Sequence, residues 1–231
     1  KIAQKAVEKL SFVSGGLKYY TDGTMGGLKT SMKNGNVDIS VVLSIATNEQ
    51  QQKNVNDFAA LINKDEKTVA FGSVFPLGDS AFEELERIKA LGLKGVKLHP
   101  DYQGFSVDDE RLFPLYKKIS ALGLITVFHA GFDYGFPPPY GATPEKLEVA
   151  LKHFETPVIA AHWGGINCCE GVLKRLCGKN IFFDITILQY LKYKLLLFLI
   201  QLHQKPYSLI YLLFLQKVLL EYPRLPQDLL L

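Results

Sequence analysis

Lysine and histidine side chains interrupt three short apolar segments of this 231-residue sequence, each near the point where the segment ends. They are Lys97 and His99 in GVKLHP, His129 in VFHAGFD and His162 in AAHWGG. Imidazole is the commonest metal ligand in proteins, and a zinc ion held by histidines with one open position generates hydroxide near neutral pH. If the three segments are neighbouring strands, the pattern predicts a metal-dependent site.

Each of these side chains also has a structural interpretation. A lone histidine at a strand end is commonly a hydrogen-bonded part of the scaffold. A buried ammonium without a partner is costly. Lys97 is therefore expected either to pair with Asp184 or Asp133, or to hold its charge against a metal site or an anionic substrate. Because three histidines end three consecutive apolar segments, we favour the functional interpretation.

The elements that must position these residues alternate between two kinds. Apolar runs typical of buried strands lie at 39–45, 69–74, 95–99, 124–129, 157–161 and 181–184, with a seventh expected in 208–214. Amphipathic stretches typical of helices lie at 1–14, 49–63, 80–91, 108–122, 143–154, 171–176 and 187–203. Alternation of this kind predicts βαβ units and a parallel sheet.

Two folds fit the alternation. One is a (β/α)8 barrel that lacks a terminal strand, in which sites lie at the carboxyl ends of the strands. The other is an open doubly wound sheet, although no G-x-G-x-x-G follows the first strand. Alternation along a strand puts Lys97 and His99 on one side. If that side faces the barrel axis, both residues point to the mouth.

Two further stretches stand apart from this alternation. The aromatic and proline-rich stretch 132–140 is predicted to be either a lid over the mouth or an ordinary surface loop. Residues 188–231 are rich in leucine, but their apolar runs at 195–202 and 207–215 are shorter than the roughly 20 residues that span a bilayer. We expect one domain over residues 1–231, with 188–231 as an atypical segment of it.

Composition excludes several classes of protein. The sequence is 48% hydrophobic and 21% charged, which is typical of a globular chain. A net charge of +3 gives no general affinity for nucleic acid or an acidic membrane. Three cysteines, two of them adjacent, are a poor disulfide or zinc framework. With no secretory signal at its start, we expect a cytoplasmic protein whose partner is a small-molecule substrate; assembly into a homo-oligomer stays open.

Five segments, taken in their order along the chain, resemble the amidohydrolase-related family of the amidohydrolase superfamily. They are FGSVFP at 71–76, ELERIKALGLKGVKLHPDYQGF at 84–105, FHAGFD at 128–133, ATPE at 142–145 and AHWGG at 161–165. The resemblance implies a TIM barrel with a divalent metal, commonly zinc, at its carboxyl mouth. It also implies hydrolysis of amide or ester-like bonds, or decarboxylation or hydration of small acids.

The resemblance assigns roles to single residues. His129 matches the metal ligand that follows the fifth strand of the family. His162 matches the histidine of the sixth strand, which is a metal ligand or a proton-transfer residue. Lys97 is expected to act in catalysis by orienting the site. The expected substrate-binding residues are His99, Asp133 and Trp163.

Two motifs of the family do not occur in this sequence. One is an H-x-H pair of metal ligands on the first strand, and the other is a metal-binding aspartate in a G-T-D-S-P-like turn after the eighth strand. Catalytic zinc usually takes three protein ligands, so we expect an incomplete barrel that binds metal weakly and has little activity. A shifted reading frame in the source gene would explain the leucine-rich tail. The alternatives are a non-catalytic pseudoenzyme or small-acid-binding module, or a decarboxylase or hydratase of the same superfamily.

Overall fold

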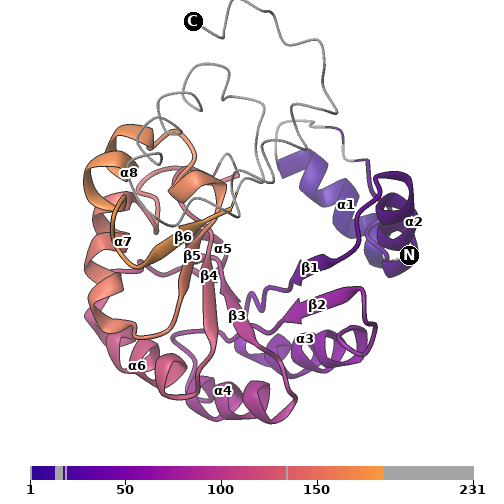
Figure 1. Ribbon diagram of the computed structural model, residues 1–231, viewed down its shortest axis with the longest axis horizontal. Coiled ribbons are helices and arrows are strands. Elements are labelled where there is room, and N and C mark those ends of the chain that lie inside the picture. Colours follow the sequence, from indigo (N-terminus) through magenta and orange to yellow (C-terminus); the bar gives the residue numbers. More distant parts are fainter. Residues whose placement is uncertain (1, 14–17, 19, 134, 185–231) are drawn as a thin grey trace, which may run out of the picture. The chain divides into compact units, whose positions relative to one another are not determined.

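Six short strands run parallel and alternate with helices in the part of the chain that the structure describes (Figure 1). The structure is a computed structural model that describes residues 2–13, 18, 20–133 and 135–184. The helix predicted at 187–203, the strand predicted in 208–214 and the atypical segment 188–231 lie outside these residues. All the described residues belong to one unit, Lys1–Thr186.

The strands and helices follow the predicted order. The strands are β1 (Ser40–Leu43), β2 (Thr68–Phe71), β3 (Gly95–Leu98), β4 (Ile125–Phe128), β5 (Val158–Ala160) and β6 (Ile181–Phe183). The α-helices are α1 (Ile2–Val13), α2 (Met25–Asn34), α3 (Glu49–Ile62), α4 (Ala81–Ala90), α5 (Pro100–Gln103), α6 (Phe113–Ala121), α7 (Pro144–Ala150) and α8 (Cys169–Arg175). Short 3-10 helices lie at Glu110–Leu112, Leu151–His153 and His162–Gly164.

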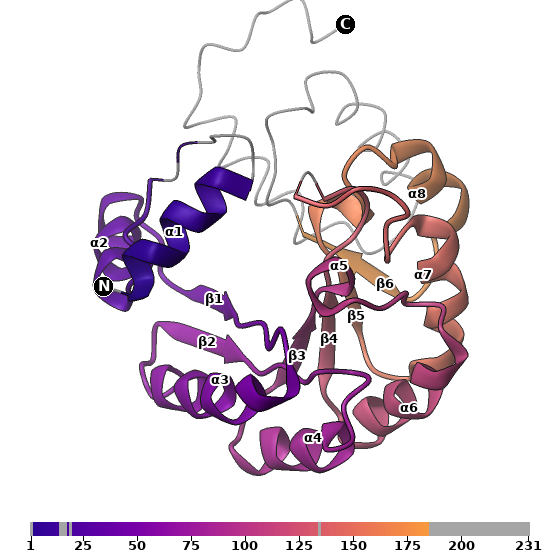
Figure 2. The ribbon, with the colours of Figure 1, turned by 180° about the vertical axis from the view of Figure 1, so that it is seen from behind.

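The strands form two parallel sheets, β1–β2 and β3–β4–β5–β6, with their helices on the outer side (Figures 1 and 2). Within the part of the chain that the structure describes, a single bridge, between Gly72 and Val96, joins the two sheets. There the N–H of Gly72 donates to the carbonyl of Gly95 at 2.9 Å, and the N–H of Lys97 donates to the carbonyl of Gly72 at 2.8 Å. The six strands thus continue one another in a curved parallel array.

The two sides of the array differ in burial. Side chains that face the helices, such as Val96, Leu98 and Phe128, are fully buried in an apolar core with Leu85 of α4 and Ile119 of α6. This burial supplies most of the stability of a parallel sheet covered by helices.

Residues on the opposite side of the strands are more open. Val41 of β1 is 57% exposed and Phe182 of β6 is 54% exposed. Phe182 lies in the register row that Lys97 shares with Val127 and Ile159. Lys97 therefore lies on the inner side of the array.

Helix boundaries depend on capping. Gly92 and Gly123 come directly after the stretches predicted to be helical at 80–91 and 108–122, and they follow α4 and α6 with φ values of 78° and 65°, a conformation that glycine adopts without strain. The helix predicted at 80–91 is α4, which has Ser80 as its N-cap. The helix predicted at 108–122 begins with a 3-10 turn.

Helix α5 was not predicted. It is one turn long, with Pro100 at its first position and Gly104, at φ 70°, at its end. So short a helix leaves no periodic pattern in the sequence. Among the described residues, none of the helices is both long and apolar enough to cross a membrane.

Candidate active site

The carboxyl ends of three adjacent strands bring three imidazole rings into contact. His99 follows β3, His129 follows β4, and His162 follows β5 after one further residue. The rings of His99 and His129 stack with their centroids 4.1 Å apart and their planes 10° from parallel. The ring of His162 is tilted by 65° against that of His129, and Nε2 of His162 lies 3.2 Å from Nδ1 of His129.

The parallel ladder is the reason that these residues meet. The N–H of His129 donates to the carbonyl of Leu98 at 3.0 Å, and the N–H of Ala161 donates to the carbonyl of Phe128 at 2.9 Å. Each strand therefore ends level with its neighbour, so that side chains distant in sequence leave the sheet at one edge.

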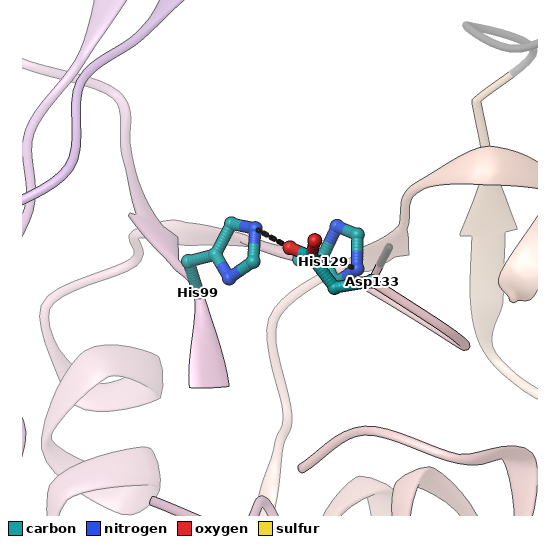
Figure 3. A group of neighbouring side chains, drawn as sticks. All are labelled: His99, His129 and Asp133. Carbon is teal, nitrogen blue, oxygen red and sulfur yellow. Dashed lines mark ion pairs between the residues drawn. The ribbon is translucent and has the colours of Figure 1, made fainter. Parts of the chain in front are cut away.

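Asp133 brings a carboxylate to the same place from the loop after β4. Its Oδ2 atom lies 3.3 Å from Nε2 of His99 and 4.0 Å from Nε2 of His129. Figure 3 shows how the three side chains lie. Nδ1 of His99 accepts a long hydrogen bond of 3.5 Å from the N–H of Tyr102. This favours the tautomer of His99 with its proton on Nε2, towards the carboxylate.

Burial controls the charge of the cluster. It lowers the pKa of His99 to about 2 and that of His129 to about 3, and the neighbouring positive groups act in the same direction. Burial also lowers the pKa of His162, against the effect of the Asp184 carboxylate. All three imidazoles are therefore neutral at neutral pH, which is the form that binds metal.

Lys97 is the positively charged member of the site. Its side chain is buried, with 6% of the residue exposed. Burial lowers the pKa of Lys97 to about 8, while the Asp184 carboxylate acts to raise it. The charge of Lys97 in turn acts to lower the pKa values of all three histidines.

The turn after β5 holds His162 in an unusual backbone conformation. Four successive residues have positive φ, namely His162 at 58°, Trp163 at 60°, Gly164 at 81° and Gly165 at 152°. Non-glycine residues rarely adopt this conformation, and it gathers at functional sites. Asp184 after β6 stabilises the turn, because its Oδ1 accepts from the N–H of His162 at 2.8 Å and its carbonyl accepts from the N–H of Trp163 at 2.9 Å.

Five of the residues singled out in the sequence thus lie together: Lys97, His99, Asp133, His129 and His162. For Trp163, the described contact is that of its backbone N–H with Asp184. Sequence analysis missed Tyr102, whose ring meets that of His99 edge-on at 4.5 Å. The sequence indicates Asp184 as a salt-bridge partner of Lys97. In the structure its carboxylate acts to raise the pKa of Lys97 and also accepts from the N–H of His162.

The loop after β4, predicted to be either a lid or an ordinary surface loop, is fixed at both ends by hydrogen bonds. The N–H of Gly131 donates to the carbonyl of Ala142 at 2.8 Å, so the ends of the loop meet. Phe136 packs edge-on against Tyr102 at 4.8 Å, and the N–H of Gly141 donates to Oδ1 of Asp101 at 3.0 Å. The loop lies on α5 and holds Asp133 over the histidines.

Residues 28–171, well over half of the chain, match the family described as Amidohydrolase. The chain belongs to this amidohydrolase family. No curated protein matches the sequence significantly.

Solved structures show the fold that the amidohydrolase chain shares. An uncharacterised TIM-barrel protein of Bordetella bronchiseptica matches with a TM-score of 0.62 and 18% identity, over 79% of this chain and 68% of its own. The 5-carboxyvanillate decarboxylase of Sphingomonas paucimobilis matches with a TM-score of 0.50 and 20% identity, over 61% of this chain and 52% of its own. These matches confirm the TIM-barrel class over the open doubly wound sheet.

A second 5-carboxyvanillate decarboxylase, from Novosphingobium aromaticivorans, matches with a TM-score of 0.51 and 15% identity, over 64% of this chain and 52% of its own. That structure holds manganese and 3-methoxy-4-hydroxy-5-nitrobenzoic acid. The amidohydrolase chain therefore spans about half the length of the two decarboxylases that it matches.

Members of the amidohydrolase superfamily bind a divalent metal, and the geometry here tests whether the cluster suits one. At Zn–N distances of about 2.0–2.1 Å, two nitrogen ligands of a tetrahedral ion lie about 3.3 Å apart. Nδ1 of His129 and Nε2 of His162 are 3.2 Å apart on tilted rings. His129 and His162 therefore suit a metal.

A second set of donors is His99, His129 and Asp133, whose ligand atoms lie within 4.8 Å of one another. An imidazole lone pair lies in the plane of its ring. Because the stacked rings of His99 and His129 are almost parallel, these two residues cannot aim their lone pairs at one ion in this conformation. His99 is thus better placed to bind Asp133 than to bind a metal together with His129.

Proposed function

We propose that this chain is a metal-dependent hydrolase of the amidohydrolase type, acting on a small molecule that carries a negative charge. The observation that carries the proposal is the meeting of Lys97, His129 and His162 at one edge of the sheet. His129 and His162 would hold a divalent cation, which we take to be zinc. Such a cation, when bound, polarises a carbonyl and lowers the pKa of a bound water.

The remaining residues have roles that follow from their charge and place. The buried ammonium of Lys97 binds and orients a carboxylate or another anionic group of the substrate, because a buried charge favours an opposite partner. Oδ2 of Asp133, within 4.0 Å of Nε2 of both His99 and His129, is placed to take up a proton. His99 holds that carboxylate in position, and Trp163 lies beside the substrate.

A decarboxylase is the second candidate. The two 5-carboxyvanillate decarboxylases share the fold, and the ammonium of Lys97 would hold a substrate carboxylate in either reaction. The two candidates differ in product, since hydrolysis of an ester or amide releases an acid, whereas decarboxylation releases carbon dioxide.

The first experiment measures metal binding by the full chain. After removal of metal with a chelator, the protein is titrated with zinc and with manganese chloride in a calorimeter. We expect weak binding of one ion per chain, because two histidines are fewer than the three protein ligands that catalytic zinc usually takes, and at least a tenfold further loss of affinity in His129→Asn and in His162→Asn. His153→Asn is the matched control, because His153 stacks on Phe113 rather than on the site histidines.

The second experiment separates the reactions. The metal-loaded chain is incubated with a p-nitrophenyl ester that carries a free carboxylate and, separately, with 5-carboxyvanillate. Release of p-nitrophenol that is lost in His129→Asn and His162→Asn supports the hydrolase, and release of carbon dioxide supports the decarboxylase instead. A wild-type chain that binds neither ion would contradict both, and would leave the small-acid-binding module as the better account.

A further inference from the structure

Side chains connect β2 and β3 at the carboxyl end of the junction between these two strands, which we call the seam. Backbone pairing there, within the described residues, is the single bridge between Gly72 and Val96. Beyond the bridge the two strands diverge into loops, and β3 continues directly into the candidate site. Lys97 and His99 therefore lie beside a junction that this one bridge pairs through the backbone.

Ser73 fills the first position beyond the bridge. Its hydroxyl donates to the carbonyl of Lys97 at 2.8 Å and accepts from the N–H of Ala46 at 3.1 Å. The residue is fully buried. One side chain thus connects the loop after β1, the end of β2 and the backbone of Lys97.

Gln103 of α5 fills the second position. Its Oε1 accepts from the N–H of His99 at 2.8 Å, and its Nε2 donates to the carbonyls of Ala46 and Val74 at 2.7 Å each. The residue is 3% exposed, and both of its amide donors are used. Gln103 therefore connects the backbone of His99 with the loops that follow β1 and β2.

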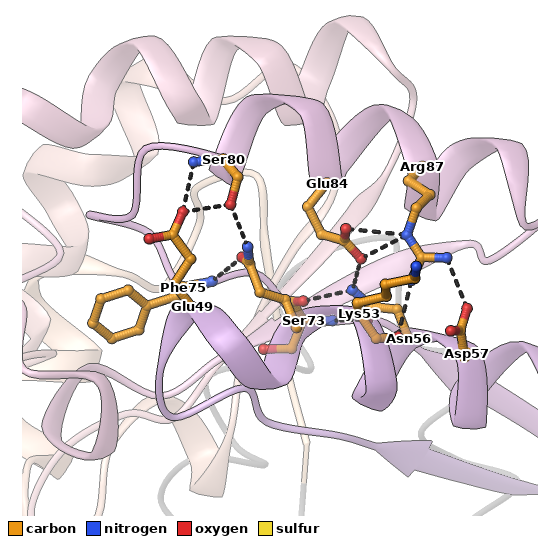
Figure 4. Close-up of polar contacts among 10 residues, drawn as sticks. Glu49, Lys53, Asn56, Asp57, Ser73, Phe75, Ser80, Glu84 and Arg87 are labelled. Carbon is orange, nitrogen blue, oxygen red and sulfur yellow. Dashed lines mark hydrogen bonds and ion pairs between the residues drawn. The ribbon is translucent and has the colours of Figure 1, made fainter.

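A second layer of polar groups fixes Ser73 from the helix side, as Figure 4 shows. Oδ1 of Asn56 accepts from the N–H of Ser73 at 2.8 Å, and its Nδ2 donates to the carbonyl of Ser73 at 2.9 Å and to Glu84 at 2.6 Å. Arg87 in turn donates to both oxygens of Glu84 at 3.1 Å. Ser73 therefore has its backbone and its hydroxyl all engaged.

We propose that Ser73 and Gln103 are positioning residues, which set the places of Lys97 and His99 in the site. Burying a polar group costs free energy unless the group is hydrogen-bonded. Apolar packing is non-directional, so packing alone would bring β2 and β3 together without orienting the backbone of Lys97 or His99. Hydrogen bonds are directional, and these two residues aim theirs at the carbonyl of Lys97 and the N–H of His99. The consequence for chemistry rests on the proposed function.

The test compares three variants of the full chain by proton–nitrogen NMR of the histidine rings and by thermal unfolding. Gln103→Met and Ser73→Ala remove the seam bonds. Asn63→Ala is the control, because Oδ1 of Asn63 accepts from the N–H of Ala70 at 3.0 Å, a similar bond to β2 away from the mouth. We expect the ring signals of His99 to shift in both seam variants, and the control to lower the Tm without moving them.

A further variant completes the test. Ser73→Thr retains the hydroxyl and should return the His99 signals towards their wild-type positions. If Gln103→Met does not fold, the His99 ring signals of Ser73→Ala alone test the proposal. Wild-type His99 signals in the folded seam variants would overturn the proposal. The ring signals are measured without metal. A wild-type chain that binds no zinc would therefore contradict the proposed function, but it would not contradict the positioning role of Ser73 and Gln103.

Discussion

Two regions of the same strands, the side that faces the helices and the carboxyl end, have opposite characters. The side that faces the helices is sealed and apolar, with Val96, Leu98 and Phe128 all fully buried. The carboxyl end, by contrast, gathers a buried ammonium, three neutral imidazoles and a carboxylate. The first region stabilises the fold, because burial of apolar surface is favourable. The second costs stability, because burial of polar and charged groups is unfavourable unless each is paired.

This difference shows how the fold can carry a reactive site. The core holds the strand ends in register, so the site residues need not stabilise their own positions. Substitutions in the core should therefore reduce stability, whereas some substitutions in the site should raise stability and abolish function.

The largest expected effect is in the core. Leu85→Ala, at a fully buried position of α4, should lower the free energy of unfolding by about 4 kcal/mol, because it removes buried methyl groups and leaves a cavity. Leu61→Ala is the matched control on α3, where the side chain is 61% exposed, and should cost less than about 1 kcal/mol. Urea unfolding measures both, and equal losses would contradict a sealed core on the helix side.

The next effect tests the close approach of backbone at the mouth. Gly131 has a φ of 78°, and a Cβ there would lie 2.1 Å from the backbone nitrogen of Ile166. Gly131→Ala should therefore cost about 3 kcal/mol through strain and overlap.

Gly92→Ala is the control for this substitution. Gly92 has the same φ of 78° but nothing within 4 Å of the added Cβ. It should cost only about 1 kcal/mol, from the left-handed backbone alone. Thermal unfolding of both variants separates backbone strain from steric overlap. If Gly131→Ala lowers the Tm no more than Gly92→Ala does, the backbone of Gly131 does not lie as close to that of Ile166 as the structure shows.

The third prediction concerns the cost of the site. Lys97→Met should raise the stability of the metal-free chain near pH 7 by on the order of 2 kcal/mol, because it removes a buried charge. The pKa of Lys97 is lowered from 10.5 to about 8 in the folded state. The wild-type chain should therefore gain stability as the pH rises from about 8 towards 10.5, and lose it as the pH falls.

Urea unfolding at several pH values between 7 and 10.5, with a chelator present, measures the difference between wild type and Lys97→Met. The gap between the two curves should narrow as the pH rises. A gap that stays constant would mean that Lys97 is not desolvated in the folded chain. The same variant should lose substrate turnover if the proposed function is correct.

The smallest effect is expected where the loop meets α5. Burial raises the pKa of Asp101, although its Oδ1 accepts from the N–H of Gly141. A raised pKa means that the wild-type chain loses stability as the pH rises through the folded value. Asp101→Asn retains an acceptor and removes the charge, so it should raise stability at neutral pH by less than about 1 kcal/mol. A clear loss in thermal unfolding at pH 7 would show that the charge itself anchors the loop.

Much of the fold could be predicted from the sequence because its signals are local. The apolar, β-branched run of β1 and the helix-ending glycines Gly92 and Gly123 mark their elements without reference to the rest of the chain. Helix α5 escaped prediction, because four residues are too few for a periodic pattern. Its importance comes from Gln103, whose three partners lie 4, 29 and 57 positions away in the sequence.

The candidate site was predictable only as a set of residues. Histidines at successive strand ends indicated that Lys97, His129 and His162 share a mouth, since parallel strands end at one edge. Their pairing was not predictable. The stacking of His99 on His129, and the contact of Nδ1 of His129 with Nε2 of His162, depend on ring rotations that packing alone fixes.

The sequence by itself determined the alternation of strands and helices, the amidohydrolase family and the residues that gather at the mouth, because these follow from periodicity and short motifs. Only the tertiary structure decided which nitrogen atoms face one another, that burial leaves the imidazoles neutral, and that Ser73 and Gln103 close the seam. Those properties depend on distances between residues far apart in the chain, and desolvation and hydrogen bonding act only once the chain has brought such residues together.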